Sequence, residues 1–233
     1  MDVNCDLGEG RPDEEKLMAL IDSCNVACGG HFGDEKSMAK TLELSKRMGV
    51  KAGAHPSFVD KENFGRKVLD VSLAELKQQI ISQIAELNQI AKSVGVTLHH
   101  VKAHGALYNE AARSEVIGNT LIDAVVFFKQ DLCIFVPYGS KLHELVKDRQ
   151  IRHWVEVFAD RNYNNKLELI SRDQTNSVVY DPSVVKQRVR KMIEDRTVVV
   201  EGGSEIPIDF DTICVHGDHP KALEFLIEIS TLK

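Results

Sequence analysis

Seven short apolar segments that fit β-strands alternate along the chain with segments that fit amphipathic helices. The strand-like segments are residues 3–7, 24–28, 50–54, 97–102, 132–136, 154–159 and 212–215. The helical segments are residues 12–21, 35–48, 72–95, 115–128, 141–147 and those that begin at residues 181 and 221. This alternation predicts parallel strands joined by right-handed helical crossovers. Before the last strand, residues 197–201 and 205–208 flank Gly202-Gly203-Ser204 and predict a small β-hairpin.

Polar residues alternate with apolar ones inside two of these strands. Asp2, Asn4 and Asp6 occupy every second position at the start of the chain, and residues 212–216 repeat the pattern. A strand in an open sheet with helices on both faces is apolar on both sides. A closed barrel whose interior holds a site explains the inward polar positions, and the alternative is a strand at the edge of an open sheet. We therefore predict an α/β fold in which residues 1–233 form a single (β/α)-barrel domain.

The composition is ordinary for a globular protein and argues against two classes of partner. The chain has 233 residues and a formal net charge of -6, and 43% of its residues are hydrophobic. It has no run rich in Lys and Arg, so we expect no nucleic-acid partner. No apolar stretch approaches the roughly 20 residues of a membrane span, so we expect no membrane partner. The first residues have no basic start and no long apolar stretch, so no signal peptide is expected.

The five cysteines are odd in number and their spacing fits no zinc motif. They fall in predicted strands, where a cysteine usually serves as a small buried apolar residue. They are Cys5, Cys24, Cys28, Cys133 and Cys214. We expect structural roles for all five, and hence a reducing, cytoplasmic compartment.

Polar and ionisable side chains gather in and directly after the predicted strands. The candidate site residues of this kind are Asn4, Asp6, Glu9, Asn25, His31, His55, Lys102, His104, Asn109, Arg161, His216 and Asp218. In (β/α) barrels the active site lies at the carboxyl ends of the strands, so we expect these residues to meet there. His31 has helix capping as its alternative role, and His55, which precedes Pro56, has turn formation. Structural or solvated roles are expected for His99, His100, His143 and His153.

Three common catalytic motifs are missing from the sequence. There is no Gly-x-x-x-x-Gly-Lys-[Ser/Thr] phosphate loop, no Gly-x-Ser-x-Gly nucleophile elbow and no Gly-x-Gly-x-x-Gly after a strand. The chemistry then falls to carboxylates, imidazoles and a lysine, which together can activate water and stabilise an oxyanion. A divalent metal ion held by Asp6, His55 and His104 is chemically reasonable as well.

Seven strings of residues, taken in order, resemble the LamB/YcsF family over essentially the whole chain. They are Asn4-Cys5-Asp6-Leu7-Gly8-Glu9-Gly10, Asn25-Val26-Ala27-Cys28-Gly29-Gly30-His31, Gly53-Ala54-His55-Pro56-Ser57, Asn63-Phe64-Gly65-Arg66, His100-Val101-Lys102-Ala103-His104-Gly105-Ala106-Leu107-Tyr108-Asn109, Glu156-Val157-Phe158-Ala159-Asp160-Arg161 and Val215-His216-Gly217-Asp218. The chain departs from the family pattern at Gly30, Phe32, Ala103 and Ser171. These departures affect the shapes of loops more than their charge.

The resemblance implies a fold, an activity and partners. The implied fold is a distorted seven-stranded (β/α) barrel of the glycoside hydrolase/deacetylase type. The implied activity is that of the 5-oxoprolinase A chain, which opens 5-oxo-L-proline to L-glutamate with partner B and C subunits. ATP is the implied cofactor, held either by this chain or by its partners.

For that reaction we expect Asp6, with His55 or His104, to activate water. Lys102 and Arg161 are expected to neutralise the developing anion or phosphate.

Either Arg66 or Arg172 is expected to hold the substrate carboxylate.

Two other functions compete with this one. The first is a metal-dependent deacetylase or amidase on the same kind of barrel. The second is a subunit without catalytic activity that binds a small molecule or serves as a scaffold.

Overall fold

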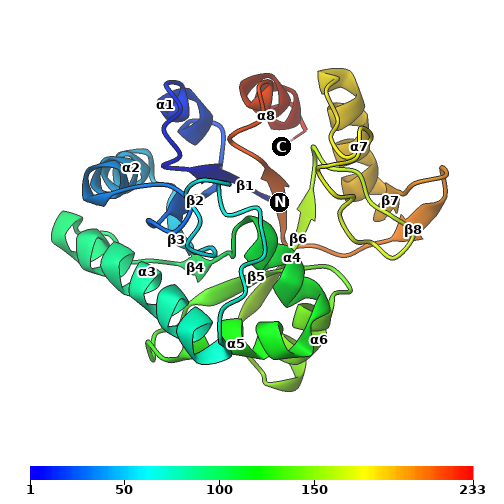
Figure 1. Ribbon diagram of the computed structural model, residues 1–233. Coiled ribbons are helices and arrows are strands. Elements are labelled where there is room, and N and C mark those ends of the chain that lie inside the picture. The colour runs from blue at the N-terminus through cyan, green and yellow to red at the C-terminus, as the bar shows by residue number, and fades with distance from the viewer. Residues whose placement is uncertain (233) are drawn as a thin grey trace.

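The seven predicted strands close into a parallel barrel, and helices cover its outside (Figure 1). We describe it from a computed structural model, which describes residues 1–232. The strand order around the barrel is β1-β2-β3-β4-β5-β6-β9. The strands are β1 (Asp2–Leu7), β2 (Ser23–Ala27), β3 (Lys51–His55), β4 (His100–Val101), β5 (Cys133–Pro137), β6 (His153–Phe158) and β9 (Thr212–Val215). The closed barrel confirms the predicted fold class and removes the open-sheet alternative.

The helices around the barrel begin and end at residues suited to those positions. They are α1 (Glu14–Met18), α2 (Glu35–Met48), α3 (Leu73–Val94), α4 (Gly105–Arg113), α5 (Glu115–Val126), α6 (Lys141–Asp148), α7 (Pro182–Glu194) and α8 (Ala222–Ser230). The carboxylate of Asp34 accepts a hydrogen bond from Ser37 N and so caps α2, which Gly49 ends with a φ of 69°. Asp181 caps α7 ahead of Pro182. Among residues 1–232, no helix is long and apolar enough to cross a membrane.

The predicted hairpin is present between α7 and β9. It consists of β7 (Thr197–Val199) and β8 (Glu205–Pro207), which pair antiparallel beside α7 (Figure 1). The segment between β6 and α7 is irregular and contains two isolated antiparallel bridges, Arg161 with Val178 and Tyr163 with Leu169. This segment supplies one wall of the cavity at the carboxyl ends of the strands.

Polar side chains occupy the interior of the barrel, as the alternation in β1 predicts. Asn4 and Asp6 point inward and bond to side chains of other strands. Their neighbours Val3 and Leu7 belong to the apolar core instead. All five cysteines are free and buried, which fits the structural role that the sequence predicts for them.

The segment around β4 differs from the prediction in two ways. The expected strand over residues 97–102 is reduced to His100–Val101, although ladder-like hydrogen bonds from His99 N and Lys102 N extend the pairing on both sides. The helix α4 was not predicted at all. It begins after His104, which makes no side-chain cap, and its first residue is Gly105 at a φ of 56°. The usual start signals of a helix are therefore missing, and burial of the α4 face against the barrel decides the conformation instead.

Candidate active site

The carboxyl ends of the strands open into a cavity of about 590 Å³. The candidate residues that line it are Asp6, His55, Arg66, Lys102, His104, Asn109, Arg161, Arg172 and His216. His55 Nε2 lies 3.4 Å from Asp6 Oδ1 and 3.0 Å from His104 Nδ1. His216 offers a ligand atom within 4.8 Å of one from Asp6. The predicted convergence of these four residues at one end of the barrel is confirmed.

The ammonium group of Lys102 forms the floor of the cavity. Its Nζ lies 2.9 Å from Asp6 Oδ1, 3.0 Å from Glu156 Oε1 and 2.9 Å from Cys214 Sγ. Burial by itself would lower the pKa of Lys102, but the negative charge of Asp6 and its other neighbours outweighs burial and holds the pKa well above its usual value. Lys102 is therefore a fixed positive charge, suited to stabilising an anion and unsuited to taking up a proton.

Asp6 is held beside Lys102 as a carboxylate. Burial would raise the pKa of Asp6, but His55 and Lys102 outweigh burial and hold the pKa well below its usual value. Asn25 Nδ2 also donates a hydrogen bond to Asp6 Oδ1 at 2.7 Å. An ionised carboxylate in this position can orient a water molecule in the cavity.

Asn4 and Asn25 do not line the cavity, and their predicted contact with substrate stays a prediction. Both are fully buried inside the barrel. Asn25 Nδ2 donates to Asn4 Oδ1 at 2.8 Å, and Asn4 Nδ2 donates to Glu156 Oε1 at 2.9 Å. These amides lie beneath Asp6 and Glu156 because they sit deeper in the strands than the strand ends. They position the two carboxylates.

His55 and His104 face each other across the carboxyl ends of β3 and β4. His55 Nδ1 donates to the carbonyl oxygen of Lys102 at 2.7 Å, and His104 Nε2 donates to that of Phe64 at 2.9 Å. A carbonyl oxygen can only accept, so both of these ring nitrogens carry hydrogen. Burial, followed by the neighbouring His31 and His55, lowers the pKa of His104 well below its usual value. His104 is therefore a neutral imidazole whose Nδ1 lone pair points at His55.

The loop before Arg66 fixes the ring of His104. Phe64 and Gly65 have positive φ values of 55° and 64°. A Cβ atom on residue 65 would lie 2.9 Å from Cβ of His31 and 3.0 Å from Cδ2 of His104, so glycine is required for this close approach. The left-handed conformation of Phe64 stores roughly 1 kcal/mol or more of backbone strain. In return, its carbonyl group is directed at His104.

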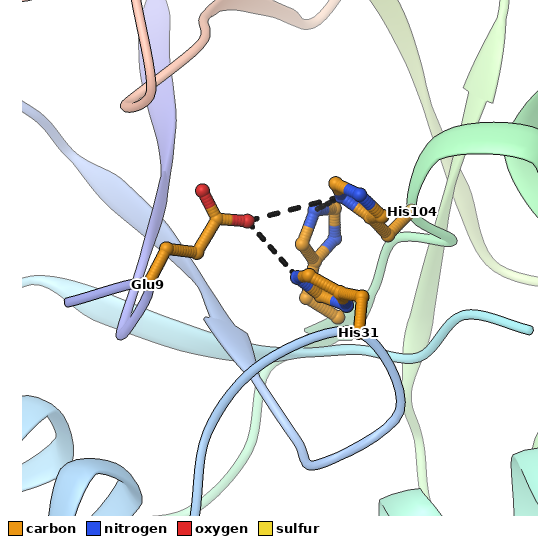
Figure 2. Close-up of side chains that lie close together, drawn as sticks. Glu9, His31 and His104 are labelled. Carbon is orange, nitrogen blue, oxygen red and sulfur yellow. Dashed lines mark hydrogen bonds and ion pairs between the residues drawn. The ribbon is translucent and has the colours of Figure 1, made fainter. Parts of the chain in front are cut away.

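Glu9 and His31 extend the histidine pair into a cluster of four side chains (Figure 2). His31 Nε2 lies 3.0 Å from Glu9 Oε1, and His104 Nδ1 lies 3.8 Å from the same oxygen. The rings of His31 and His104 stack with centroids 3.7 Å apart. Burial and then His55 lower the pKa of His31 to about 2, whereas burial and then Asp6 raise the pKa of Glu9 well above its usual value.

Neither Glu9 nor His31 lines the cavity itself, so their contact with a ligand stays a prediction. They contact His104, which does line it, because the loops after β1 and β2 fold behind that ring. His31 does not cap a helix either, since the N-cap of α2 is Asp34.

His216 is held against the opposite wall of the cavity by Asp160. His216 Nδ1 lies 2.9 Å from Asp160 Oδ1, and the backbone N–H of His216 donates to Oδ2 at 3.1 Å. Burial would raise the pKa of Asp160, but His216 outweighs burial and the pKa lies below its usual value. The ring of His216 also stacks on Phe158 at a centroid distance of 5.2 Å. Its orientation is therefore fixed from two sides.

Two arginines form the mouth of the cavity and share one carboxylate. Arg66 pairs with Asp218, and Arg172 Nη1 lies 3.6 Å from the same carboxylate. Both arginines line the cavity and are partly exposed, whereas Asp218 does not line it. The carboxylate of Asp218 orients the two guanidinium groups, and its predicted contact with a ligand stays a prediction. Asn109 on α4 lies exposed on the cavity wall.

Arg161 is buried in the wall that the irregular segment forms. Its Nε donates to Ser177 O at 3.1 Å and its Nη2 donates to Ile170 O at 2.5 Å. Burial and then Arg172 lower the pKa of Arg161 to about 10, so the group stays positively charged at neutral pH. Arg161 therefore holds this wall together, and its role in neutralising phosphate stays a prediction.

Glu156 and Tyr108 belong to the site, although neither was among the residues predicted for it. Glu156 is 1% exposed, and its Oε2 and the Tyr108 hydroxyl are buried atoms without a hydrogen-bond partner in the described part of the chain. Both residues line the cavity. Glu156 had a visible signal, since it is a charged residue between the apolar Val155 and Val157 in a predicted strand. Tyr108 also had a signal, since it is a polar residue after the fourth predicted strand and directly precedes the candidate Asn109.

Among residues 1–232, two groups of side chains have ligand atoms within 4.8 Å of one another, close enough to hold a metal ion. They are Asp6, Cys214 and His216 in one group, and Glu9, His31, His55 and His104 in the other. Lys102 Nζ contacts both Asp6 and Cys214, so the ammonium group of Lys102 already takes the place of a metal ion in the first group. The predicted set of Asp6, His55 and His104 is thus divided, and only the second group is a candidate metal centre.

A parallel barrel with ionisable side chains at the carboxyl ends of its strands is the architecture of a (β/α)-barrel protein with a site of enzymatic type. The LamB/YcsF family matches residues 1–232. This chain belongs to that family.

Similar proteins agree with this assignment along nearly the whole chain. The chain is 41% identical to the 5-oxoprolinase A chain of Campylobacter jejuni subsp. jejuni serotype O:6, covering 98% of this chain and 92% of that one. It is 40% identical to the 5-oxoprolinase A chain of Syntrophobacter fumaroxidans, covering 95% and 89%. The crystal structure of a lactam utilization protein from Thermus thermophilus superposes with a TM-score of 0.92 at 31% identity, covering 99% and 94%.

Proposed function

We propose that this chain is the A component of a 5-oxoprolinase and that it opens the lactam ring of 5-oxo-L-proline to give L-glutamate. The names of relatives at about 40% identity support this proposal. The observation that carries it is the buried, permanently charged Lys102 on the cavity floor, beside the carboxylate of Asp6 and the imidazoles of His55 and His104. Together these groups can activate water and stabilise the anion that forms at a carbonyl group.

The reaction needs an activation step, because an unstrained lactam is a poor electrophile. Transfer of the terminal phosphoryl group of ATP to the lactam oxygen makes the ring carbon electrophilic and releases ADP. Water then adds to that carbon, the ring C–N bond breaks, and the nitrogen leaves as the amine after taking up a proton. The resulting acyl phosphate is hydrolysed to glutamate and inorganic phosphate, which balances the reaction.

We assign the ATP-binding step to partner B and C subunits. The reason is that the sequence has no phosphate-binding loop of the kind that nucleotide sites use. Free, buried cysteines and the need for ATP are consistent with work in the cytoplasm.

Each part of the cavity has a role in this scheme. Lys102 faces the oxygen on which negative charge develops. Asp6, with His55 or His104, orients the attacking water and accepts its proton. Arg66 or Arg172 at the mouth holds the substrate carboxylate, since both guanidinium groups line the cavity and are partly exposed.

The test is to purify this chain alone and together with its B and C partners, and to measure glutamate release from 5-oxo-L-proline with and without ATP. We expect ATP-dependent release from the complete complex and little or none from the isolated chain. Robust turnover by the isolated chain would show that the assignment of ATP binding to the partner subunits is wrong. A complex that binds 5-oxo-L-proline without releasing glutamate would favour a binding or scaffold function.

A further inference from the structure

Three histidines and one glutamate from four successive strand ends converge at the edge of the cavity. Glu9 follows β1, His31 follows β2, His55 ends β3 and His104 follows β4. One ligand atom from each lies within 4.8 Å of the others, and all three histidine side chains are buried. Figure 2 shows the Glu9 carboxylate directed at the rings of His31 and His104.

The hydrogen bonds of two of these rings leave lone pairs facing each other. His55 uses its Nδ1–H for the Lys102 carbonyl, and His104 uses its Nε2–H for the Phe64 carbonyl. These bonds leave His55 Nε2 and His104 Nδ1 facing each other 3.0 Å apart. Two lone pairs at this distance repel each other unless a proton or another cation lies between them. The backbone therefore orients both rings toward a positively charged ligand.

We propose that Glu9, His31, His55 and His104 bind a divalent transition-metal ion, such as Zn²⁺, through Glu9 Oε1, His31 Nε2, His55 Nε2 and His104 Nδ1. Ligand atoms about 2.1 Å from a metal lie roughly 3.0–3.4 Å from one another. The separations of 3.0 Å between His31 and Glu9, and between His55 and His104, have this size. Metal-bound histidines commonly donate their other N–H to a carbonyl, as His55 and His104 do.

The set of donor atoms favours a transition-metal ion over the other cations that could lie there. A shared proton between His55 Nε2 and His104 Nδ1 joins only those two atoms, whereas one metal ion would engage all four side chains. Mg²⁺ and Ca²⁺ prefer oxygen ligands, whereas three imidazoles and a carboxylate suit Zn²⁺, Co²⁺ or Mn²⁺.

The role of the ion, unlike its binding, rests on the proposed function. His55 and His104 line the cavity, so an ion between them reaches the space in which the lactam would lie. There it can polarise a carbonyl or phosphoryl oxygen, or lower the pKa of a bound water molecule. Lys102 would then stabilise the anion from the floor while the ion acts from the side.

Metal binding can be tested without substrate. The chain is stripped with a chelator, and metal content is measured after dialysis against Zn²⁺. Binding of Co²⁺ is followed by its visible absorption and by calorimetry. We expect one ion per chain, with the Co²⁺ spectrum of a site that contains nitrogen ligands. In the His31→Gln and Glu9→Gln variants we expect the affinity to fall by at least about 10-fold. The matched control is His143→Gln, which removes a histidine from α6 and should bind like the wild type.

Melting temperatures of the metal-free proteins separate a lost ligand from a lost fold. Glu9→Gln is nearly isosteric, so it keeps the test valid if His31→Gln fails to fold. Absence of binding at millimolar Zn²⁺ and Co²⁺ by folded wild-type protein would overturn the proposal, as would equal affinity in the variants and the control. Metal binding without glutamate release by the complex would leave this site intact and would reject the proposed function instead.

Discussion

Buried polar side chains at the amino end of the barrel bond to one another, whereas those at the carboxyl end surround a cavity. At the amino end, Asp2 accepts hydrogen bonds from Ser23 Oγ at 2.8 Å and from Thr212 Oγ1 at 2.7 Å. Lys51 Nζ lies 3.2 Å from the same carboxylate. Each group has a partner of the opposite kind, so the network holds strands together and offers nothing to a ligand.

The carboxyl end also holds buried polar groups but leaves several of them without a hydrogen-bond partner. Within residues 1–232, His31 Nδ1, Glu156 Oε2 and the Tyr108 hydroxyl are buried without hydrogen-bond partners. His55 Nε2 and His104 Nδ1 also face each other at 3.0 Å and need a proton or another cation between them. A buried polar atom without a partner costs about 1–3 kcal/mol. The difference between the two ends shows that buried polar residues indicate a ligand site only where some of them lack hydrogen-bond partners.

The largest effect should come from His104→Gln in the complete complex. Glutamine keeps similar bulk but does not take up a proton near neutral pH and does not replace an imidazole ligand. We expect turnover per folded complex to fall by about 10²–10⁴-fold with little change in melting temperature. The control is His143→Gln, because His143 does not line the cavity. Near-normal turnover with a large drop in melting temperature would make His104 a structural residue like those at the amino end.

Lys102→Met should affect both rate and stability, since Lys102 joins the cavity to the buried network. Loss of the ammonium leaves the carboxylates of Asp6 and Glu156 buried and unpaired. We expect the free energy of unfolding to fall by about 3–5 kcal/mol and ATP-dependent glutamate release to fall strongly. Denaturant unfolding and turnover per folded complex measure the two effects. A stable variant with normal turnover would show that the fixed charge has no role.

Asp2→Ala should affect stability alone, unlike His104→Gln and Lys102→Met, which should both lower turnover. The change leaves the hydroxyls of Ser23 and Thr212 without their acceptor. We expect the free energy of unfolding to fall by roughly 3 kcal/mol, whereas turnover per folded complex stays near that of the wild type. Urea unfolding followed by assay under native conditions checks both expectations. A large loss of turnover in fully folded Asp2→Ala protein would contradict the distinction between the amino and carboxyl ends of the barrel.

The smallest effect should be the pH dependence of stability that Asp160 contributes. Its pKa in the folded protein lies below the usual value of about 3.9, because His216 outweighs burial. The stabilisation is therefore present above about pH 4 and is lost as the pH falls through the lower, folded-state pKa. We expect Asp160→Asn to be less stable than the wild type by about 1–2 kcal/mol at pH 7. The gap should close as the pH falls below about 4. Unfolding curves at pH 7, 5 and 3 measure it, and a gap independent of pH would contradict the assignment.

The sequence by itself was enough to predict the barrel and where its site lies. Strand and helix periods are local, and so is the alternation of Asp2, Asn4 and Asp6, which placed polar groups inside a closed barrel. The parallel order of the strands then required their carboxyl ends to meet, so Asp6, His55 and His104 were expected together. Local signals sufficed because each depends on residues only a few positions apart.

Tertiary structure alone decided which candidates face the cavity and which lie behind it. Asn4 and Asn25 were expected beside a ligand, and the packing of seven strands places them beneath Asp6. Glu9 and His31 contact His104, an approach that depends on Gly65 in a loop distant in the sequence. Helix α4 lacked local start signals and forms because its apolar face is buried. Such outcomes depend on contacts between residues far apart in the chain, and no local pattern in the sequence specifies those distances.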